Sequence, residues 1–281
     1  MKNEVPVRLC QPLPREGDPG SFGAQRRHDI HTGIDLYTDP KAAVFAIEDG
    51  TVVRVEDFTG PKADSPWWND TKAVFVEGHS GVIVYGEIEP LDRVQEGLAV
   101  QAGDQIGHVV QVLKKNKGVS PVNMLHLELY QKGQRQSVWW KKDETRPENL
   151  KDPSALLENN IFMSPEFVLI DMEYKDKTAK RSGVPLINHI KEGIDILEKR
   201  GVSLTTIKAY CLHPLIQSDI DLAKNAEKIA RLVDPYALLL ATEYRKTANA
   251  YLSQRTIGSL DDIELSPLPE VNEMLVADKI Q

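Results

Sequence analysis

Short apolar or alternating runs, punctuated by glycine, fill residues 40–130 of the chain. Alternation of apolar and polar positions over about four to eight residues is typical of half-buried β-strands. We therefore predict a strand-rich first domain. The expected strands are residues 44–47, 51–55, 73–77, 82–85, 105–110 and 125–130.

Glycine-containing segments between these runs predict how the strands connect. Residues 48–50 and 77–81 have the composition of hairpin turns. Residues 97–100 and 103–107 resemble two edges of a small barrel, where glycine allows chains to cross closely. The pattern favours a small antiparallel, barrel-like sheet.

The spacing of apolar positions changes after residues 147–153, where two prolines interrupt the chain. Apolar residues then recur at intervals of three and four, the period of an amphipathic helix. Helices are expected at residues 166–177, 185–197, 204–212, 219–233 and 235–252, and strong helix formers dominate them. We predict an α+β protein of two domains: a β-rich domain over residues 1–160 and an all-helical bundle over residues 161–281.

Composition excludes several classes of function. The chain has 281 residues and a net charge of -8, and neither half carries the positive excess that binding of a nucleic-acid backbone requires. Cys10 and Cys211 are far apart and predict no disulfide framework, so we expect free thiols in a reducing environment.

The beginning of the chain lacks the apolar core of a signal peptide, and no window has the length of a membrane helix. We therefore expect no membrane span and a protein that is cytoplasmic as synthesised. A substrate outside the cell would require release by lysis, within a phage particle or through specialised secretion.

A candidate metal site begins with His31 and Asp35, four residues apart, and a distant His126 supplies a third donor. Alternation along residues 125–129 places His126 and Glu128 on the same strand face. Two neutral imidazoles and one carboxylate leave positive charge on zinc, and three ligands leave a coordination position open. This donor set predicts a catalytic zinc ion rather than a structural one.

Aromatic residues supply candidates for substrate binding. Trp67 and Trp68 lie in the long loop of residues 58–69, and loops of this length inside a compact domain are often functional. The pair either lines a groove for a sugar or peptide or folds back as a lid on the barrel. Tyr85 is a third candidate, whereas packing is expected of Trp139 and Trp140.

Residues 25–157 resemble the lysostaphin-type zinc endopeptidases, which cut peptide crosslinks of bacterial cell walls. The H-x-x-x-D segment of that family matches His31 and Asp35, and the last histidine of its H-L-H-F-E strand matches His126. Further matches lie at residues 44–53, 100–107 and 149–157. The resemblance implies that His31, Asp35 and His126 are zinc ligands. It also implies a cell-wall peptide or peptidoglycan as substrate.

Two positions depart from that family pattern. Met124 stands where the first histidine of H-x-H is expected, and Glu87 replaces another catalytic histidine. Methionine cannot transfer a proton, but a carboxylate is a workable general base for a zinc-bound water. Three interpretations stay open. The domain is an active peptidase that uses Glu87, or it is a non-catalytic zinc-holding protein with a binding or regulatory role, either wall-binding or phage-associated. In the third, the apparent ligands are an evolutionary remnant that no longer binds metal.

The second half resembles the HD-type helical domain of guanosine tetraphosphate hydrolases over most of residues 166–281. The resemblance rests on residues 175–189, on residues 209–213 and on residues 277–279. It implies His189, His213 and Asp278 as the remaining candidates for metal binding.

The HD pattern is damaged at its acidic positions. Pro214 replaces a metal-binding aspartate, and Gln217 and Ser218 stand in place of an acidic pair. Manganese-like ions prefer oxygen ligands, so we expect no second metal ion. A guanine nucleotide-binding or partner-binding module, or packing on the first domain, is expected instead. Further helical residues are expected after Lys279 in an HD-type domain, so we expect the C-terminal end of this sequence to be truncated.

Overall fold

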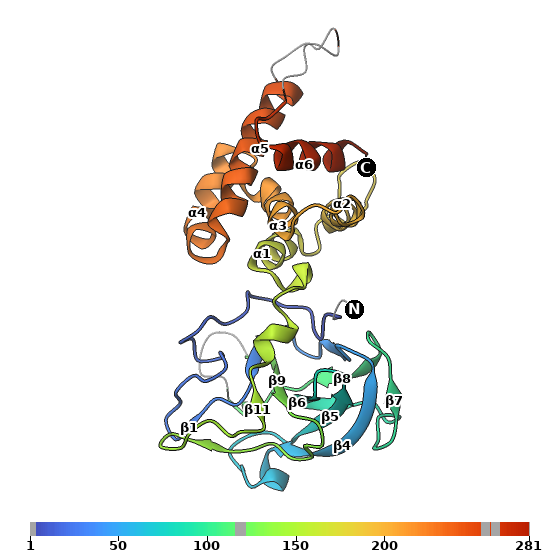
Figure 1. The fold of residues 1–281 in the computed structure, drawn as a ribbon, viewed down its shortest axis with the longest axis vertical. Helices are drawn as coiled ribbons and strands as arrows, with labels where there is room; N and C mark the ends of the chain where they lie inside the picture. The colour runs from blue at the N-terminus through green and yellow to red at the C-terminus, as the bar shows by residue number, and fades with distance from the viewer. Residues whose placement is uncertain (1–3, 116–121, 254–258, 260–264, 281) are drawn as a thin grey trace. The chain divides into compact units, whose positions relative to one another are not determined.

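The computed structural model describes residues 4–115, 122–253, 259 and 265–280. The chain divides into two compact units, residues 1–163 (the first unit) and residues 164–281 (the helical unit). The first unit is rich in antiparallel strands, and the described part of the helical unit contains six α-helices (Figure 1).

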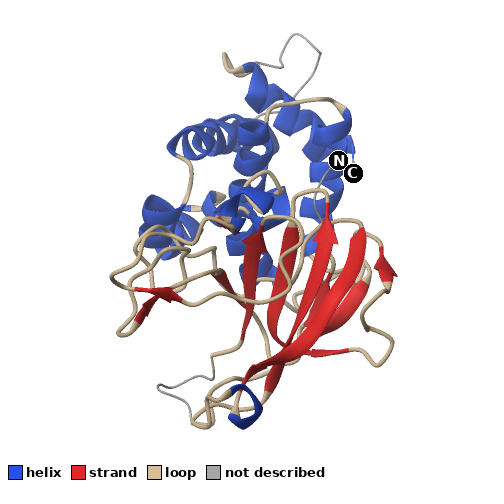
Figure 2. Cartoon of the chain, turned by 60° about the horizontal axis from the view of Figure 1, so that its bottom comes forward, coloured by secondary structure: helices blue, strands red, loops and turns tan. Residues whose placement is uncertain are grey.

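A nine-stranded antiparallel sheet forms the body of the first unit. Its main path runs β11-β9-β6-β5-β4-β7; β2 also pairs with β9, and β8 pairs with β3 and β6. Figure 2 shows the long strands curving around one another. The strands are β2 (Ile34–Tyr37), β3 (Ala43–Phe45), β4 (Gly50–Thr59), β5 (Thr71–Gly78), β6 (Val82–Pro90), β7 (Ala99–Val100), β8 (Gln105–Val109), β9 (Met124–Tyr130) and β11 (Leu150–Lys151). Two short strands, β1 (Asp29–Ile30) and β10 (Trp140–Lys141), form a separate pair.

Each of the six predicted strands overlaps an observed one, and the turn at residues 77–81 joins β5 to β6, with Glu77 opposite Val82. The hairpin predicted at residues 48–50 is wrong. β3 pairs with β8, whereas β4 pairs with β5 and β7. A local turn pattern cannot show that both strands find partners distant in sequence. The strand β2, which holds Asp35, was missed because four residues give too short a pattern.

Central strands of the sheet are buried on both faces. The consecutive residues Ala73, Val74, Phe75 and Val76 of β5 are fully buried. Full burial of neighbours whose side chains alternate between faces explains the nearly continuous apolar run in the sequence. This rigid sheet holds the polar side chains that emerge from β2, β6 and β9.

Serine caps define where several helices of the helical unit begin. The hydroxyls of Ser164, Ser203 and Ser218 accept hydrogen bonds from backbone N–H groups in the first turns of α1, α3 and α4. The helices are α1 (Pro165–Tyr174), α2 (Ile187–Lys199), α3 (Leu204–Leu212), α4 (Asp219–Leu232), α5 (Pro235–Ser253) and α6 (Pro269–Ile280).

The five predicted helices overlap α1 to α5, and the all-helical character of the second half is confirmed. The helix α6 was not predicted. The HD-like assignment stays a prediction. Among the described residues, no helix combines the length and the apolar character needed to cross a membrane.

Candidate metal centre and substrate pocket

The register of the sheet brings two of the three predicted zinc ligands together. Asp35 on β2 lies directly opposite His126 on β9, so their side chains lie on the same face. His31 precedes β2 and is fixed by a hydrogen bond from its backbone N–H to the Ala24 carbonyl. Glycine is required at position 33, between His31 and Asp35, because a Cβ there would lie 2.8 Å from the His126 ring.

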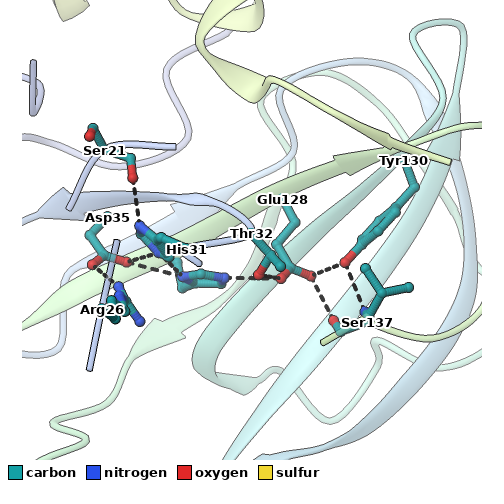
Figure 3. Close-up of polar contacts among 10 residues, drawn as sticks. Ser21, Arg26, His31, Thr32, Asp35, Glu128, Tyr130 and Ser137 are labelled. Carbon is teal, nitrogen blue, oxygen red and sulfur yellow. Dashed lines mark hydrogen bonds and ion pairs between the residues drawn. The ribbon is translucent and has the colours of Figure 1, made fainter. Parts of the chain in front are cut away.

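Three donor atoms converge at this point (Figure 3). His31 Nε2 lies 3.1 Å from His126 Nδ1 and 3.2 Å from Asp35 Oδ1, and His126 Nδ1 lies 3.0 Å from Asp35 Oδ1. Zinc with bond lengths of about 2.0–2.1 Å in tetrahedral geometry separates neighbouring ligand atoms by about 3.3 Å. The triangle therefore has nearly the dimensions of one face of a zinc tetrahedron.

The outer nitrogens of both imidazoles have fixed partners. His31 Nδ1 donates to the Ser21 carbonyl at 2.9 Å, which leaves the lone pair on Nε2 facing the centre. His126 Nε2 donates to Glu128 Oε1 at 3.2 Å, so Nδ1 is the nitrogen that faces Asp35. Hydrogen bonding of the outer nitrogen is the usual way in which a protein orients histidine toward a metal ion.

Electrostatics at the centre favour a positive charge among the three donors. Burial lowers the pKa of His31. Although burial opposes its charged form, hydrogen bonds to Asp35 and Glu128 raise the pKa of His126 to about 10. Burial likewise opposes ionisation of Asp35, but the two histidines hold its pKa well below the usual range. A proton supplies the positive charge when no metal is bound, and the donor set fits a metal cation in its place.

Glu128 supports the centre from behind His126. Its carboxylate accepts hydrogen bonds from Thr32 Oγ1 at 2.6 Å, Ser137 Oγ at 2.6 Å and the Tyr130 hydroxyl at 3.1 Å. Burial opposes its ionisation, but His126, Ser137 and Thr32 lower the pKa of Glu128. The carboxylate therefore stays ionised and holds the ring of His126 in place.

Glu87, the candidate general base, lies on β6 and lines a pocket over the three donor atoms. Its φ of 64° is in the left-handed region, which costs about 1–3 kcal/mol for a residue other than glycine. Its Oε2 is buried without a hydrogen-bond partner in the described part of the chain. Burial, followed by the negative charge of Asp35, raises the pKa of Glu87 to about 8, while His126 and Arg26 act in the opposite direction.

An open pocket of about 210 Å³ lies over the centre. Aromatic side chains form much of its wall, and charged and polar groups lie around the donors. The lining includes Arg26, His31, Thr32, Phe58, Trp68, Glu87, His126, Glu128, Ser137, Trp139 and Trp140. The mixture of flat apolar rings and hydrogen-bonding groups fits an extended peptide or a sugar.

The structure separates the aromatic candidates. Trp68 lines the pocket, whereas the neighbouring Trp67 is 64% exposed and is not part of the lining. Trp140 packs against the core, as expected, but packing was the wrong expectation for Trp139, which is 69% exposed at the pocket. Tyr85 is fully buried, and its hydroxyl accepts a hydrogen bond from the Ile47 N–H, so its ring lies in the core rather than at the substrate surface.

The three second-half candidates also lie together. His189 Nε2 is 3.3 Å from Asp278 Oδ1, and the ring of His213 is 5.5 Å from that of His189. His213 Nδ1 donates to the Tyr210 carbonyl, and burial lowers the pKa of His213 to about 4. Lys279 Nζ lies 2.6 Å from Asp278 Oδ2 and already neutralises the single carboxylate of the cluster.

The sequence pattern does not single out Arg26, although Arg26 Nη2 donates a 3.0 Å hydrogen bond to Oδ2 of Asp35, a residue of the metal centre. An arginine in a loop has no spacing that distinguishes it from other surface cations. The expectation that Trp139 packs was wrong because only the fold, and no local pattern, brings residue 139 to the pocket.

Known proteins provide an independent comparison. Residues 29–138 match the model of peptidase family M23. The matched segment is less than half of the chain and contains all three converging donors and Glu87. Curated protein sequences give no match.

Solved structures similar to the chain include Helicobacter pylori Csd3 (21% identity, 51% of this chain, 36% of that chain, TM-score 0.32) and the catalytic domain of lysostaphin from Staphylococcus simulans (18%, 56%, 92%, 0.31). A zinc-containing peptidase from Vibrio cholerae is 21% identical over 43% of this chain and 36% of that chain, with a TM-score of 0.29. The chain thus spans less than half of the first of these. Similarity at these values does not extend to activity, so the functional argument rests on the family match and on the geometry of the centre.

Proposed function

We propose that the first unit is a zinc-dependent peptidase that acts on cell-wall peptides. The observation that carries this proposal is the triangle of His31 Nε2, Asp35 Oδ1 and His126 Nδ1, whose edges measure 3.0–3.2 Å. The match of residues 29–138 to peptidase family M23 supports the same reaction class. The resemblance of residues 25–157 to zinc endopeptidases that cut cell-wall crosslinks favours the bacterial wall as the source of substrate.

Different residues around the zinc site would transfer the proton, orient a ligand and bind the substrate. Bound zinc lowers the pKa of water and polarises a peptide carbonyl. Glu87 accepts the proton from the attacking water at its buried Oε2, which has no hydrogen-bond partner among the described residues, and passes it to the leaving nitrogen. Glu128 keeps His126 oriented, and the rings of Trp68 and Trp139 hold the peptide across the pocket.

Zinc binding is tested by metal analysis of the purified protein. We expect one zinc per chain in the wild type and loss of that zinc in His126→Ala, because two donors alone hold zinc weakly. The matched control is His28→Ala, which removes an exposed histidine just outside the donor set and should retain the metal. Equal zinc content in wild type and His126→Ala contradicts the assigned site.

Catalysis is tested by digestion of purified peptidoglycan. We expect Glu87→Gln to lower the rate by about 10²–10⁴, the usual contribution of a general base, with unchanged zinc content. Glu89→Gln, an exposed position two residues further along β6, is the control. Unchanged digestion by Glu87→Gln removes Glu87 as the base.

A second candidate is a non-catalytic zinc-holding protein that binds the wall or belongs to a phage. The absence of both family imidazoles, with Met124 and Glu87 in their places, favours it. A wild-type protein that holds zinc and binds peptidoglycan without digesting it would establish this alternative.

For the helical unit we propose partner binding rather than metal or nucleotide binding. An open pocket of about 500 Å³ includes His213, Asp278 and Lys279, with Glu173 and Asp221 adding two further carboxylates. Lys279 is the one lysine or arginine among the described residues of this lining, and it is paired with Asp278, while Glu173 is paired with Lys177 and Lys224. The pocket therefore offers little unpaired positive charge to the phosphates of a guanine nucleotide. Calorimetric titration with a guanine nucleotide should therefore show no binding, and a measurable affinity would contradict this.

A further inference from the structure

Arg26 stands at the edge of the metal centre, in the pocket over it. Its Nη2 donates to Asp35 Oδ2 at 3.0 Å, while the other oxygen of the same carboxylate belongs to the donor triangle. Figure 3 shows Arg26 beside Asp35, on the opposite side of the centre from Glu128. The side chain is 39% exposed, so it is neither buried in the core nor free in solvent.

The backbone fixes the place from which Arg26 reaches the pocket. Its N–H donates to the Asp29 carbonyl at 2.9 Å, and Gln25 forms an isolated bridge with Ile30. A tight loop therefore presents the side chain, and Asp35 holds one end of its guanidinium. Because a guanidinium has five N–H donors and Asp35 occupies one, donors are left to face the pocket.

The charge of Arg26 fills a chemical gap in this site. Among the described residues that line the pocket, Arg26 is the one lysine or arginine. Met124 and Glu87 have replaced the two imidazoles that the resembling peptidases use, and neither replacement carries a positive charge. Zinc bound to His31 and His126 would keep both imidazoles neutral. Arg26 would then be the one cationic side chain, among the described lining residues, that negative charge developing on a substrate carbonyl can meet.

We propose that Arg26 is a catalytic residue that donates hydrogen bonds to the oxyanion formed during peptide hydrolysis, a role that rests on the proposed peptidase function. Water adds its oxygen to the carbonyl carbon as its proton passes to Glu87, and the carbonyl π pair moves onto oxygen, where Arg26 donates. The pair then returns as the C–N bond breaks, and the leaving nitrogen takes the proton from Glu87. Preorganised donors of this kind contribute most where charge develops in the transition state.

The test uses the full chain loaded with zinc and compares Arg26→Ala and Arg26→Lys with wild type. Arg27→Ala is the matched control, because it removes a neighbouring exposed guanidinium. Three quantities are measured: zinc affinity by chelator competition, affinity for methylphosphonate by calorimetry, and kcat and KM for peptidoglycan fragments. Methylphosphonate serves as a small tetrahedral oxyanion, so this readout does not depend on turnover.

We expect Arg26→Ala to lower kcat by about 10²–10³, the effect of losing one oxyanion donor, with KM changed by less than about threefold. Methylphosphonate affinity should fall at least about tenfold, because one charge-assisted hydrogen bond is lost. Zinc affinity should stay nearly constant. Arg26→Lys should recover part of both losses, and Arg27→Ala should match wild type.

Two results would overturn the role of Arg26 and leave the proposed peptidase function standing. One is zinc-loaded Arg26→Ala with wild-type methylphosphonate affinity and kcat. The other is a loss confined to zinc affinity, which would make Arg26 only an anchor for Asp35. Wild-type protein that binds no zinc overturns both this inference and the proposed function.

Discussion

Glu87 combines three properties: a left-handed backbone, a buried oxygen with no hydrogen-bond partner among the described residues, and a pKa raised to about 8 by burial. Each of these destabilises the folded chain. Such costs concentrate at functional sites, where the surrounding structure holds a reactive group in place. These costs agree with the proposed role of Glu87 as general base.

Cysteine chemistry provides a prediction at the scale of single residues. Cys211 in α3 is fully buried, and burial, with the negative charge of Glu166, raises the pKa of its thiol well above the usual range. Since the thiolate is the reactive form, Cys211 should not react with a disulfide reagent at pH 8 in the native protein. We expect one accessible thiol, that of the half-buried Cys10, and two after unfolding.

The control for this experiment is Cys10→Ser, which should show no rapid reaction until it is denatured. Rapid labelling of native Cys10→Ser would mean that α3 opens readily. Raising the pH from 8 to 9 should leave Cys211 unreactive, because its pKa lies above this interval.

At the scale of elements, the packing of α2 on α3 depends on one glycine. A Cβ on Gly193 would lie 2.2 Å from the ring of Tyr210, which is fully buried. The ring also packs against the rings of His189 and His213, with centroids 6.0 and 4.8 Å away, which restricts its movement. Gly193 therefore sets the distance between the two helices, and helix propensity alone would favour alanine there.

We predict that Gly193→Ala destabilises the helical unit by about 1–3 kcal/mol, the usual cost of overpacking a core. Urea unfolding followed by circular dichroism measures the effect. Glu192→Ala, at the adjacent exposed position of α2, is the control and should change stability by less than about 0.5 kcal/mol. A stabilised Gly193→Ala protein would show that Tyr210 moves aside at little cost.

At the scale of the whole molecule, the chain contains two compact units, and the three converging donors all belong to the first. A ligand that binds only the folded form raises the stability of the unit that holds it. We predict that zinc raises the unfolding temperature of the first unit by several degrees and leaves that of the helical unit unchanged.

Calorimetric scans with zinc and with a chelator check this prediction. His126→Ala should abolish the zinc-dependent shift, because it removes one of the three donors. An equal shift of both transitions would contradict independent units. A shift that persists in His126→Ala would place the zinc elsewhere.

The hydrophobic pattern by itself determined that the first half is strand-rich and the second half helical, because alternation and helical spacing are local properties of the sequence. It located the cores of β4, β5, β6, β8 and β9, and those of α1 to α5. It also placed His126 and Glu128 on one strand face, and His126 Nε2 does lie 3.2 Å from Glu128 Oε1. Motif spacing singled out His31 and Asp35, four residues apart.

Tertiary structure alone decided the pairing of β3 with β8, the burial of Tyr85 and the positions of Arg26 and Trp139 at the pocket. These depend on contacts between residues far apart in sequence, which no local pattern records. The donor triangle shows both contributions: sequence supplied residues of the right chemistry, and the register of β2 against β9 brought Asp35 opposite His126. Register fixes geometry because each residue of an antiparallel strand has one opposite neighbour.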